Sequence, residues 1–156
     1  MSSYWLEWAK DHKNENVIDG DYVADVCIVG AGICGLTAGY YLSKKGLKVI
    51  IIDKNEIGEK TSGNTTAKIT FQHNLIYNYL INLYGKEFAL KYLKANEEAI
   101  SNIKTIVDEE KIDCDFELQT NYVYTTDENE IEKIQKEVNA INRLKRRRLC
   151  TICDQL

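Results

Sequence analysis

The feature of this sequence that most constrains its fold is a glycine-rich turn between two apolar segments. Residues 30–35 read Gly-Ala-Gly-Ile-Cys-Gly and follow a short, mostly β-branched run at 25–29, which predicts a buried strand. Residues 36–45 have helical composition, and residues 47–52 predict a second buried strand that ends at Asp53. A strand, a glycine turn, a helix and a second strand with a terminal acid, within about thirty residues, are typical of a dinucleotide-binding βαβ unit.

Each of five residues of the turn has a physical role in that interpretation. Gly30 permits the tight turn out of the strand, and Gly35 lets the helix lie close to the strand. Gly32 lacks the Cβ atom that would hold a pyrophosphate away from the backbone. The N–H groups of Ile33 and Cys34 belong to the first helical turn, so they face the phosphates with the positive end of the helix dipole behind them.

Asp53 is expected to accept hydrogen bonds from an adenosine ribose, because it ends the second strand of the unit. Its negative charge would repel a ribose 2′-phosphate, which argues against NADP. The alternative to a nucleotide site is a glycine-rich turn of a βαβ unit that binds nothing.

The whole chain has the composition of one ordinary globular domain. It holds 156 residues, of which 44% are hydrophobic and 28% are charged, with a net charge of −4. This acidic balance gives no electrostatic reason to bind nucleic acid. No apolar run has the length of a membrane span, and the polar N-terminus does not have the pattern of a secretory signal. We therefore expect a cytoplasmic protein that neither binds nucleic acid nor spans a membrane.

The cysteines predict neither a disulfide framework nor a metal site. Their number is five, which is odd, and the expected compartment is reducing. Cys27 and Cys34 are expected to be packing residues. Cys150 and Cys153 have metal-ligand spacing, but structural zinc needs four ligands and the two histidines are far apart in sequence. The basic run at 145–148 is interpreted as a solvated end of the chain.

Outside the βαβ unit, the apolar pattern predicts further helices and at least one strand. Residues 1–22 are expected to form an irregular lead-in. Apolar residues at three- and four-residue steps predict helices over 75–84 and 86–109. The β-forming residues between 115 and 125 predict one or two strands.

A last helix is predicted to begin near residue 127. Asp127 and Glu130 have the spacing of a capping box. The apolar residues of its expected inner face are Ile131, Ile134, Val138 and Ile141.

The loop that follows Asp53 bears on whether the expected ligand is a flavin or a nicotinamide nucleotide. Residues 61–68 read Thr-Ser-Gly-Asn-Thr-Thr-Ala-Lys and are dense in small hydroxyl and amide groups. Such donors suit a ligand that continues past the pyrophosphate to a ring with carbonyl and imide edges, as FAD does. Composition alone supports equally a solvated polar loop with helix-capping threonines.

Several segments together carry a resemblance to a known family. They are Ser3-Tyr4-Trp5, the glycine turn with its flanks at 25–37, the loop at 61–68 with Gln72-His73, and the stretches at 92–100 and 122–126. On these residues the chain resembles the FAD-dependent oxidoreductases of the D-amino acid oxidase and glycine oxidase type. It looks most similar to the bacterial branch that often carries a C-terminal Rieske iron–sulfur domain. The resemblance covers about residues 3–144.

The resemblance implies FAD as the cofactor and assigns its contacts residue by residue. In the family a hydride passes from the carbon beside an amine to flavin N5, which leaves an imine that water hydrolyses. The residues that match the pyrophosphate turn are Gly30, Gly32, Ile33, Cys34 and Gly35. Asp53 matches the ribose acid, and Lys54 matches a basic neighbour of the adenosine. The residues that match the loop under the flavin are Thr61, Ser62, Thr65, Thr66 and Lys68. His73 is expected to be structural, and no catalytic residue is assigned.

The chain also departs from the family pattern, because members of this type are considerably longer. Residues 1–144 are expected to form an incomplete FAD-binding domain in which the substrate region begins at about 112. Residues 145–156 are expected to be an unmatched tail, as in a truncated or frame-shifted reading. Apolar faces that a missing sheet would cover are expected to favour self-association; they include Phe116, Tyr122, Ile134 and Ile141.

The expected fold is α/β, a Rossmann-like FAD-binding βαβ unit followed by the start of an α+β substrate region. The expected function is that of an FAD-dependent oxidoreductase acting on a small-molecule amine or amino acid, of which this chain is an N-terminal portion that is inactive alone. Three alternatives stay open: a fragment of an NAD-linked dehydrogenase, a non-catalytic dinucleotide-binding module or defective gene product without activity, and a small interaction protein.

Overall fold

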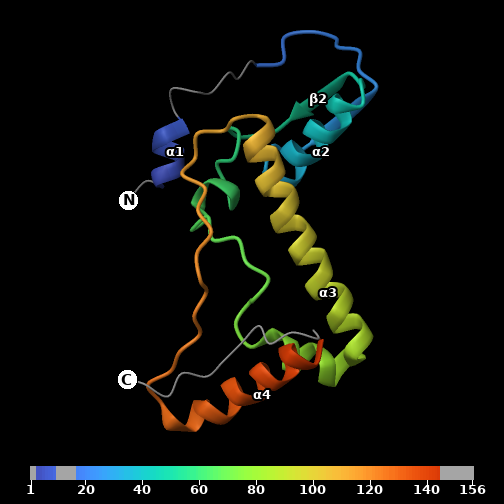
Figure 1. The fold of residues 1–156 in the computed structure, drawn as a ribbon. Helices are drawn as coiled ribbons and strands as arrows, with labels where there is room; N and C mark the ends of the chain where they lie inside the picture. The colour runs from blue at the N-terminus through green and yellow to red at the C-terminus, as the bar shows by residue number, and fades with distance from the viewer. Residues whose placement is uncertain (1–2, 10–16, 145–156) are drawn as a thin grey trace. The chain divides into compact units, whose positions relative to one another are not determined.

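The computed structural model of the chain describes residues 3–9 and 17–144, and it divides into two compact units, Met1–Lys68 and Ile69–Leu156. Figure 1 shows the order of the elements along the chain. They are α1 (Tyr4–Ala9), β1 (Val26–Val29), α2 (Ile33–Lys44), β2 (Val49–Ile52), a short 3₁₀ helix (Ser62–Asn64), α3 (Ile76–Glu109) and α4 (Glu128–Leu144). None of the described helices is both long and apolar enough to cross a membrane.

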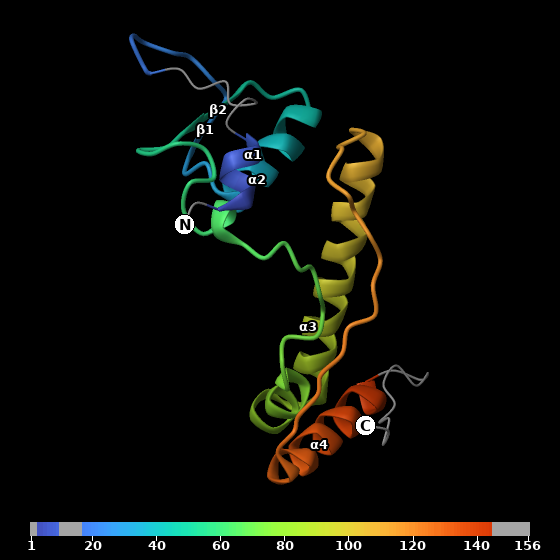
Figure 2. The same cartoon turned by 90° about the vertical axis from the view of Figure 1, so that its left-hand side faces the viewer.

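The first unit contains the βαβ arrangement that the sequence predicts. β1 and β2 pair in parallel, with Val26 opposite Val49 and Val29 opposite Ile52, and α2 makes the connection between them. α2 ends where Gly46 takes a positive φ of 84°, a backbone conformation that glycine adopts at helix C-termini without steric cost. Figure 2 shows both strands beside α2.

The strands are less buried than the sequence predicts. Along β1 the side chains alternate between half-buried and exposed, and Val29 is 83% exposed. Side chains alternate between the two faces of a sheet, and α2 packs on the face where Ile28 and Ile51 lie against Gly39. Cys27, on the opposite face, and Cys34, in the first turn of α2, are both exposed. The prediction that these cysteines are packing residues is therefore wrong.

The N-terminal residues that were expected to be irregular contain a helix. α1 covers Tyr4–Ala9, and it contacts the short 3₁₀ helix of the same unit. A helix of only six residues is too short to show an apolar periodicity, and isolated helices of this length are unstable in water. Tertiary contacts must therefore stabilise it.

The second unit is built from α3 and α4. α3 is interrupted at Gly85, where φ is 83° and ψ is 166°, so the two helices predicted on either side of this residue are both present. Figures 1 and 2 show α4 lying against the first part of α3. The buried side chains between them are Tyr77, Leu80, Ala89, Leu93, Ala140, Ile141 and Leu144.

A buried glutamate joins the two helices of the second unit. Glu137 of α4 is 4% exposed, and Leu75, the N-cap residue of α3, makes no side-chain cap. The carboxylate of Glu137 accepts hydrogen bonds from the backbone N–H groups of Tyr77 at 2.9 Å and Asn78 at 2.7 Å, and from Gln72 Nε2 at 2.8 Å. It therefore satisfies two of the N–H groups that the first turn of a helix leaves unpaired, and its charge suits the positive end of the helix dipole.

At the start of α4, only one of the two side-chain contacts of the predicted capping box is present. Asp127 Oδ1 accepts a hydrogen bond from the Asn129 N–H at 2.9 Å. The Glu130 side chain instead accepts from Lys133 Nζ at 2.6 Å, while the Asp127 N–H donates to Thr125 Oγ1 at 3.0 Å. The predicted reciprocal bond from Glu130 is therefore wrong, because a nearby cation and a nearby hydroxyl each offer a local partner.

The inner face of α4 is narrower than the apolar pattern predicts. Ile141 is fully buried, while Ile134 and Val138 are half-buried. Ile131 is 52% exposed, so its assignment to the inner face is wrong. Ile131 lies one turn from the start of the helix, and the buried cluster is formed by the later turns.

Residues 115–125 do not form the predicted strands. The segment is extended in both views but has no strand assigned, and Leu118, Tyr122 and Tyr124 are exposed. A strand needs a neighbour to bond its backbone, and the described part of the second unit offers none. The set of residues expected to be uncovered also changes: Tyr122 is exposed, Phe116 and Ile134 are half-buried, and Ile141 is buried against α3.

Candidate functional site

The glycine turn between β1 and α2 has the close approach that its sequence predicts. Gly30 has a φ of +114°, and its N–H donates to the Ile52 carbonyl at 2.7 Å. A Cβ atom at Gly35 would lie 1.9 Å from the Gly30 carbonyl oxygen. Because this neighbour is backbone, only glycine allows α2 to start so close to β1, and the packing role expected of Gly35 is confirmed.

Asp53 ties the end of β2 to the same turn. Its Oδ2 accepts a hydrogen bond from the Ala31 N–H at 2.7 Å, and its Oδ1 accepts one from the Asn55 N–H at 3.0 Å. The Ala31 N–H, with the Asn55 N–H second, holds the pKa of Asp53 below its usual range. Each carboxylate oxygen has two lone-pair sites, so Asp53 keeps acceptor capacity for a ribose, and that role stays a prediction.

This geometry predicts a pH-dependent signal at the turn. The folded-state pKa of Asp53 is lowered, so the bond to Ala31 stabilises the fold above the unfolded-state pKa and is lost as pH falls through the folded one. We expect the Ala31 amide resonance to shift in an NMR titration with a midpoint below the ordinary Asp value of about 3.9. Asp53→Asn should abolish this titration. A midpoint above the ordinary value would contradict the assignment.

The loop after β2 reaches the glycine turn through Ser62. Ser62 Oγ accepts a hydrogen bond from the Ile33 N–H at 2.9 Å, and a Cβ atom at Gly32 would lie 3.3 Å from the same oxygen. A second connection runs from the Gly58 N–H to the Ala31 carbonyl at 3.0 Å. The structure thus brings together two segments that sequence analysis assigned to one cofactor, the pyrophosphate turn and the start of the flavin loop.

The other predicted residues of the loop, Thr61, Thr65, Thr66 and Lys68, have no bond to the glycine turn among those described. The Thr61 carbonyl accepts from the Asn64 N–H at 3.2 Å, and Thr65 Oγ1 accepts from the Ala67 N–H at 3.1 Å. Thr66 and Lys68 are exposed in the segment that follows. Their roles beneath a flavin stay predictions, as does that of Lys54, whose charge contributes to the low pKa of Asp53.

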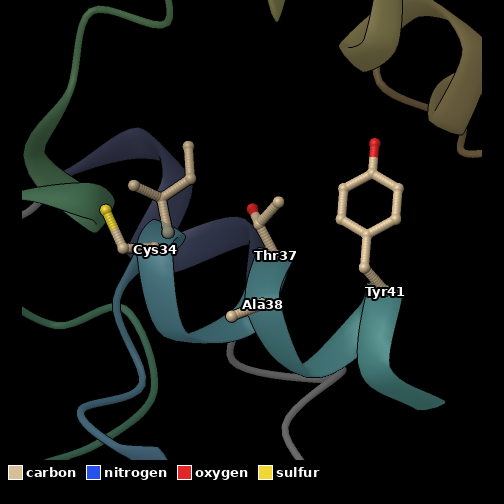
Figure 3. A pocket seen from close by; sticks show the side chains of 5 residues that line it. Cys34, Thr37, Ala38 and Tyr41 are labelled. Carbon is tan, nitrogen blue, oxygen red and sulfur yellow. The ribbon is translucent and has the colours of Figure 1, made fainter.

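Cys34 lines an open pocket on the surface of α2. The pocket is formed by Ile33, Cys34, Thr37, Ala38 and Tyr41, which recur at the spacing of one helix face. Figure 3 shows the side chains of Thr37 and Tyr41 pointing to the same side of the helix. This apolar surface begins at the residues whose N–H groups form the helix N-terminus.

Sequence analysis missed two groups of residues that shape the molecule. One is Glu137, whose buried carboxylate has no pattern in the sequence because its partners lie about sixty residues away. The other is the N-terminal segment: the Trp5 indole N–H donates to the Thr65 carbonyl at 2.9 Å, and the Ser3 hydroxyl donates to the Gly63 carbonyl. Ser3 and Trp5 were noted only as part of a family resemblance.

The sequence also singled out His73 and the cysteine pair at 150 and 153. His73 lies in the second unit, where its Nδ1 is 2.9 Å from the Tyr92 hydroxyl. Cys150, Cys153 and the basic run at 145–148 lie outside the described residues. Within residues 3–9 and 17–144, no three His, Cys, Asp or Glu side chains group as ligands for a metal ion.

The donors at the turn fit the phosphates of a dinucleotide. The first N–H groups of α2 are directed away from the helix, and Ile33, the first residue of the helix, is 63% exposed. The Gly32 and Gly35 positions carry no side chain. The Ser62 hydroxyl, which accepts from the Ile33 N–H, can instead donate its own O–H to a phosphate oxygen, which leaves the Ile33 N–H as a second donor. An anion with acceptor oxygens matches this set of hydrogen-bond donors.

Comparison with known proteins identifies the family. The family model described as FAD dependent oxidoreductase (DAO) matches residues 25–153. The Bacillus subtilis (strain 168) protein YhfW, named as a Rieske 2Fe-2S iron–sulfur protein, is 40% identical over 142 residues, 91% of this chain and 28% of that protein. Gamma-glutamylputrescine oxidoreductase of Escherichia coli (strain K12) is 24% identical over 115 residues, 74% of this chain and 27% of that protein.

A third relative matches a shorter part of the chain. Monomeric sarcosine oxidase of Arthrobacter sp. (strain TE1826) is 56% identical over 36 residues, 23% of this chain and 9% of that protein. No solved structure matches the chain significantly. The chain spans less than a third of the length of the first two relatives, at 28% and 27%. The family and the cofactor predicted from the sequence are confirmed: the chain belongs to the DAO family of FAD-dependent oxidoreductases.

Proposed function

We propose that this chain is the FAD-binding portion of a cytoplasmic oxidoreductase that oxidises a small-molecule amine or amino acid. The observation that carries the proposal is the hydrogen bond from the Ile33 N–H to Ser62 Oγ at 2.9 Å, because it joins the expected flavin loop to the expected pyrophosphate turn. Two relatives are named for amine compounds, gamma-glutamylputrescine and sarcosine, which supports this substrate class. The family favours FAD over the NAD-linked alternative.

The proposed contacts with FAD come from the glycine turn, from Asp53 and from the loop at 61–68. The N–H groups of Ile33 and Cys34 bind the pyrophosphate, aided by the dipole of α2. Asp53 binds the adenosine ribose while it keeps Ala31 in place. The loop from Thr61 to Lys68 carries the contacts toward the ring. When bound, FAD supplies the hydride acceptor, and the residues of this chain bind and orient it.

FAD titration of purified chain tests this proposal. Gly32→Val should obstruct the pyrophosphate, and Asp53→Ala should weaken binding by at least about tenfold, the scale of one lost charge-assisted hydrogen bond. Asp25→Ala is the matched control, because Asp25 Oδ2 accepts the Lys48 N–H at 2.8 Å at the opposite end of the same strand pair. Equal dissociation constants for Asp53→Ala and the parent would refute the assignment.

We also propose that this chain does not turn over an amine alone. In the described part of the second unit, the apolar side chains of Leu118 and Tyr122 are 73% and 77% exposed, and such surfaces favour association with a covering partner. An anaerobic screen of amines and amino acids should leave the absorbance of the FAD-loaded chain unchanged. Bleaching by any of these compounds in a monomeric preparation would show that the chain is a complete enzyme.

A further inference from the structure

α1 contacts the loop that carries the proposed flavin contacts. The Trp5 indole N–H donates to the Thr65 carbonyl at 2.9 Å, and the Ser3 hydroxyl donates to the Gly63 carbonyl. The two acceptors stand on either side of Asn64, so α1 holds the loop backbone at two points. Figures 1 and 2 show α1 beside the short 3₁₀ helix of this loop.

The apolar face of α1 fixes the same stretch of backbone. Gly63 is buried, and a Cβ atom there would lie 2.4 Å from Leu6 Cδ2 and 2.5 Å from the Gly58 carbonyl oxygen. Both the Leu6 side chain and the loop's own backbone at residue 58 therefore pack against Gly63. The Gly63 N–H completes this contact by donating to the Gly58 carbonyl at 2.6 Å.

The part of the loop that α1 contacts lies next to Ser62, the residue that reaches the glycine turn. Ser62 directly precedes Gly63, and its Oγ accepts the Ile33 N–H. Gly58, against which Gly63 packs, donates to the Ala31 carbonyl at 3.0 Å. A continuous set of contacts thus runs from α1 through the loop to the first turn of α2.

We propose that α1 is a brace that orders the 61–65 loop before FAD binds, with Ser3 and Trp5 as positioning residues. This inference rests on the proposed function, because it assigns the brace to the loop that is proposed to hold FAD. A loop that is ordered in advance loses less conformational entropy on binding, so the ligand binds more tightly without any added contact. α1 therefore contributes to affinity without contact with FAD.

The test uses the full chain and two measurements. Ser3→Ala and Trp5→Phe each remove one donor, and Ser3→Thr restores the hydroxyl. Tyr4→Phe is the matched control, because Tyr4 is an exposed neighbour on α1. Hydrogen exchange reports the order of the loop amides at residues 63 and 64 without FAD, and fluorescence titration reports the FAD dissociation constant.

We expect the Ser3→Ala/Trp5→Phe double variant to exchange these amides faster and to bind FAD about tenfold more weakly, the scale of one or two lost hydrogen bonds. Tyr4→Phe should match the parent in both measurements. Ser3→Thr should bind FAD nearly as tightly as the parent, whereas Ser3→Ala should bind it more weakly.

Two results would overturn the proposal that α1 is a brace and leave the proposed function standing. They are unchanged exchange in the double variant, or faster exchange with an unchanged FAD dissociation constant. If the parent chain itself fails to bind FAD, the proposed function fails, and the flavin role of the brace fails with it. Faster exchange in the double variant would then still show that α1 orders the loop. The exchange measurement thus separates the two failures.

Discussion

Replacing Glu137 with leucine should lower the free energy of unfolding of the second unit by about 2–6 kcal/mol, because two backbone N–H groups each lose a partner at a cost of about 1–3 kcal/mol. The affected groups belong to Tyr77 and Asn78. Leucine has a similar volume, so the substitution removes the acceptors without opening a cavity. Denaturant unfolding followed by helical circular dichroism measures the change.

The matched control is Glu132→Leu on the same helix. Glu132 forms an ion pair with Lys136 at 2.8 Å, and both side chains are mostly exposed, so its loss should leave the unfolding midpoint near that of the parent. A Glu137→Leu variant that unfolds at the parent's denaturant concentration would show that the Glu137 carboxylate does not stabilise α3.

Gly35→Ala should disrupt the nucleotide turn, with a loss of about 3 kcal/mol or more in stability, which is the upper end of the cost of overpacking. The added Cβ would lie 1.9 Å from the Gly30 carbonyl oxygen and 3.1 Å from its carbon. Because these atoms are backbone, α2 must move away from β1, and FAD binding should be lost with it. Thermal unfolding and FAD titration of the same sample measure both effects.

Gly39→Ala provides the comparison one turn further along α2. There an added Cβ would lie 2.6 Å from Ile51 Cδ1, the mobile end of a side chain that can turn aside. Alanine also favours the helix by up to about 1 kcal/mol relative to glycine. We therefore expect Gly39→Ala to keep most of the stability and the FAD affinity of the parent. Equal losses in the two variants would refute the argument from the Gly30 carbonyl.

The sequence predicted the parts of the fold that depend on local pattern. The glycine spacing and the two β-branched runs identified the βαβ unit, and Gly85 separated two helices correctly. These features depend on backbone conformation and side-chain periodicity within a few residues. The family and the cofactor followed from a resemblance that several segments carry together, among them the glycine turn and the polar loop at 61–68.

The parts that sequence analysis missed depend on partners distant in the chain. Glu137 looks like any surface glutamate until Tyr77 and Asn78 are placed beside it. α1 forms because a loop sixty residues later accepts bonds from Ser3 and Trp5. The error at 115–125 has the opposite cause, because β-forming side chains cannot make a strand without a neighbouring backbone.

The cap on α3 by Glu137 also sets an order of events during synthesis. The first unit is Met1–Lys68, so the contacts among its own residues can form once that stretch has left the ribosome. The first turn of α3 waits for a carboxylate about sixty residues downstream. Domains generally fold as units in the order of their synthesis. The glycine turn, whose described partners Ile52, Asp53 and Ser62 lie in the first unit, can therefore form while the second unit is still being translated.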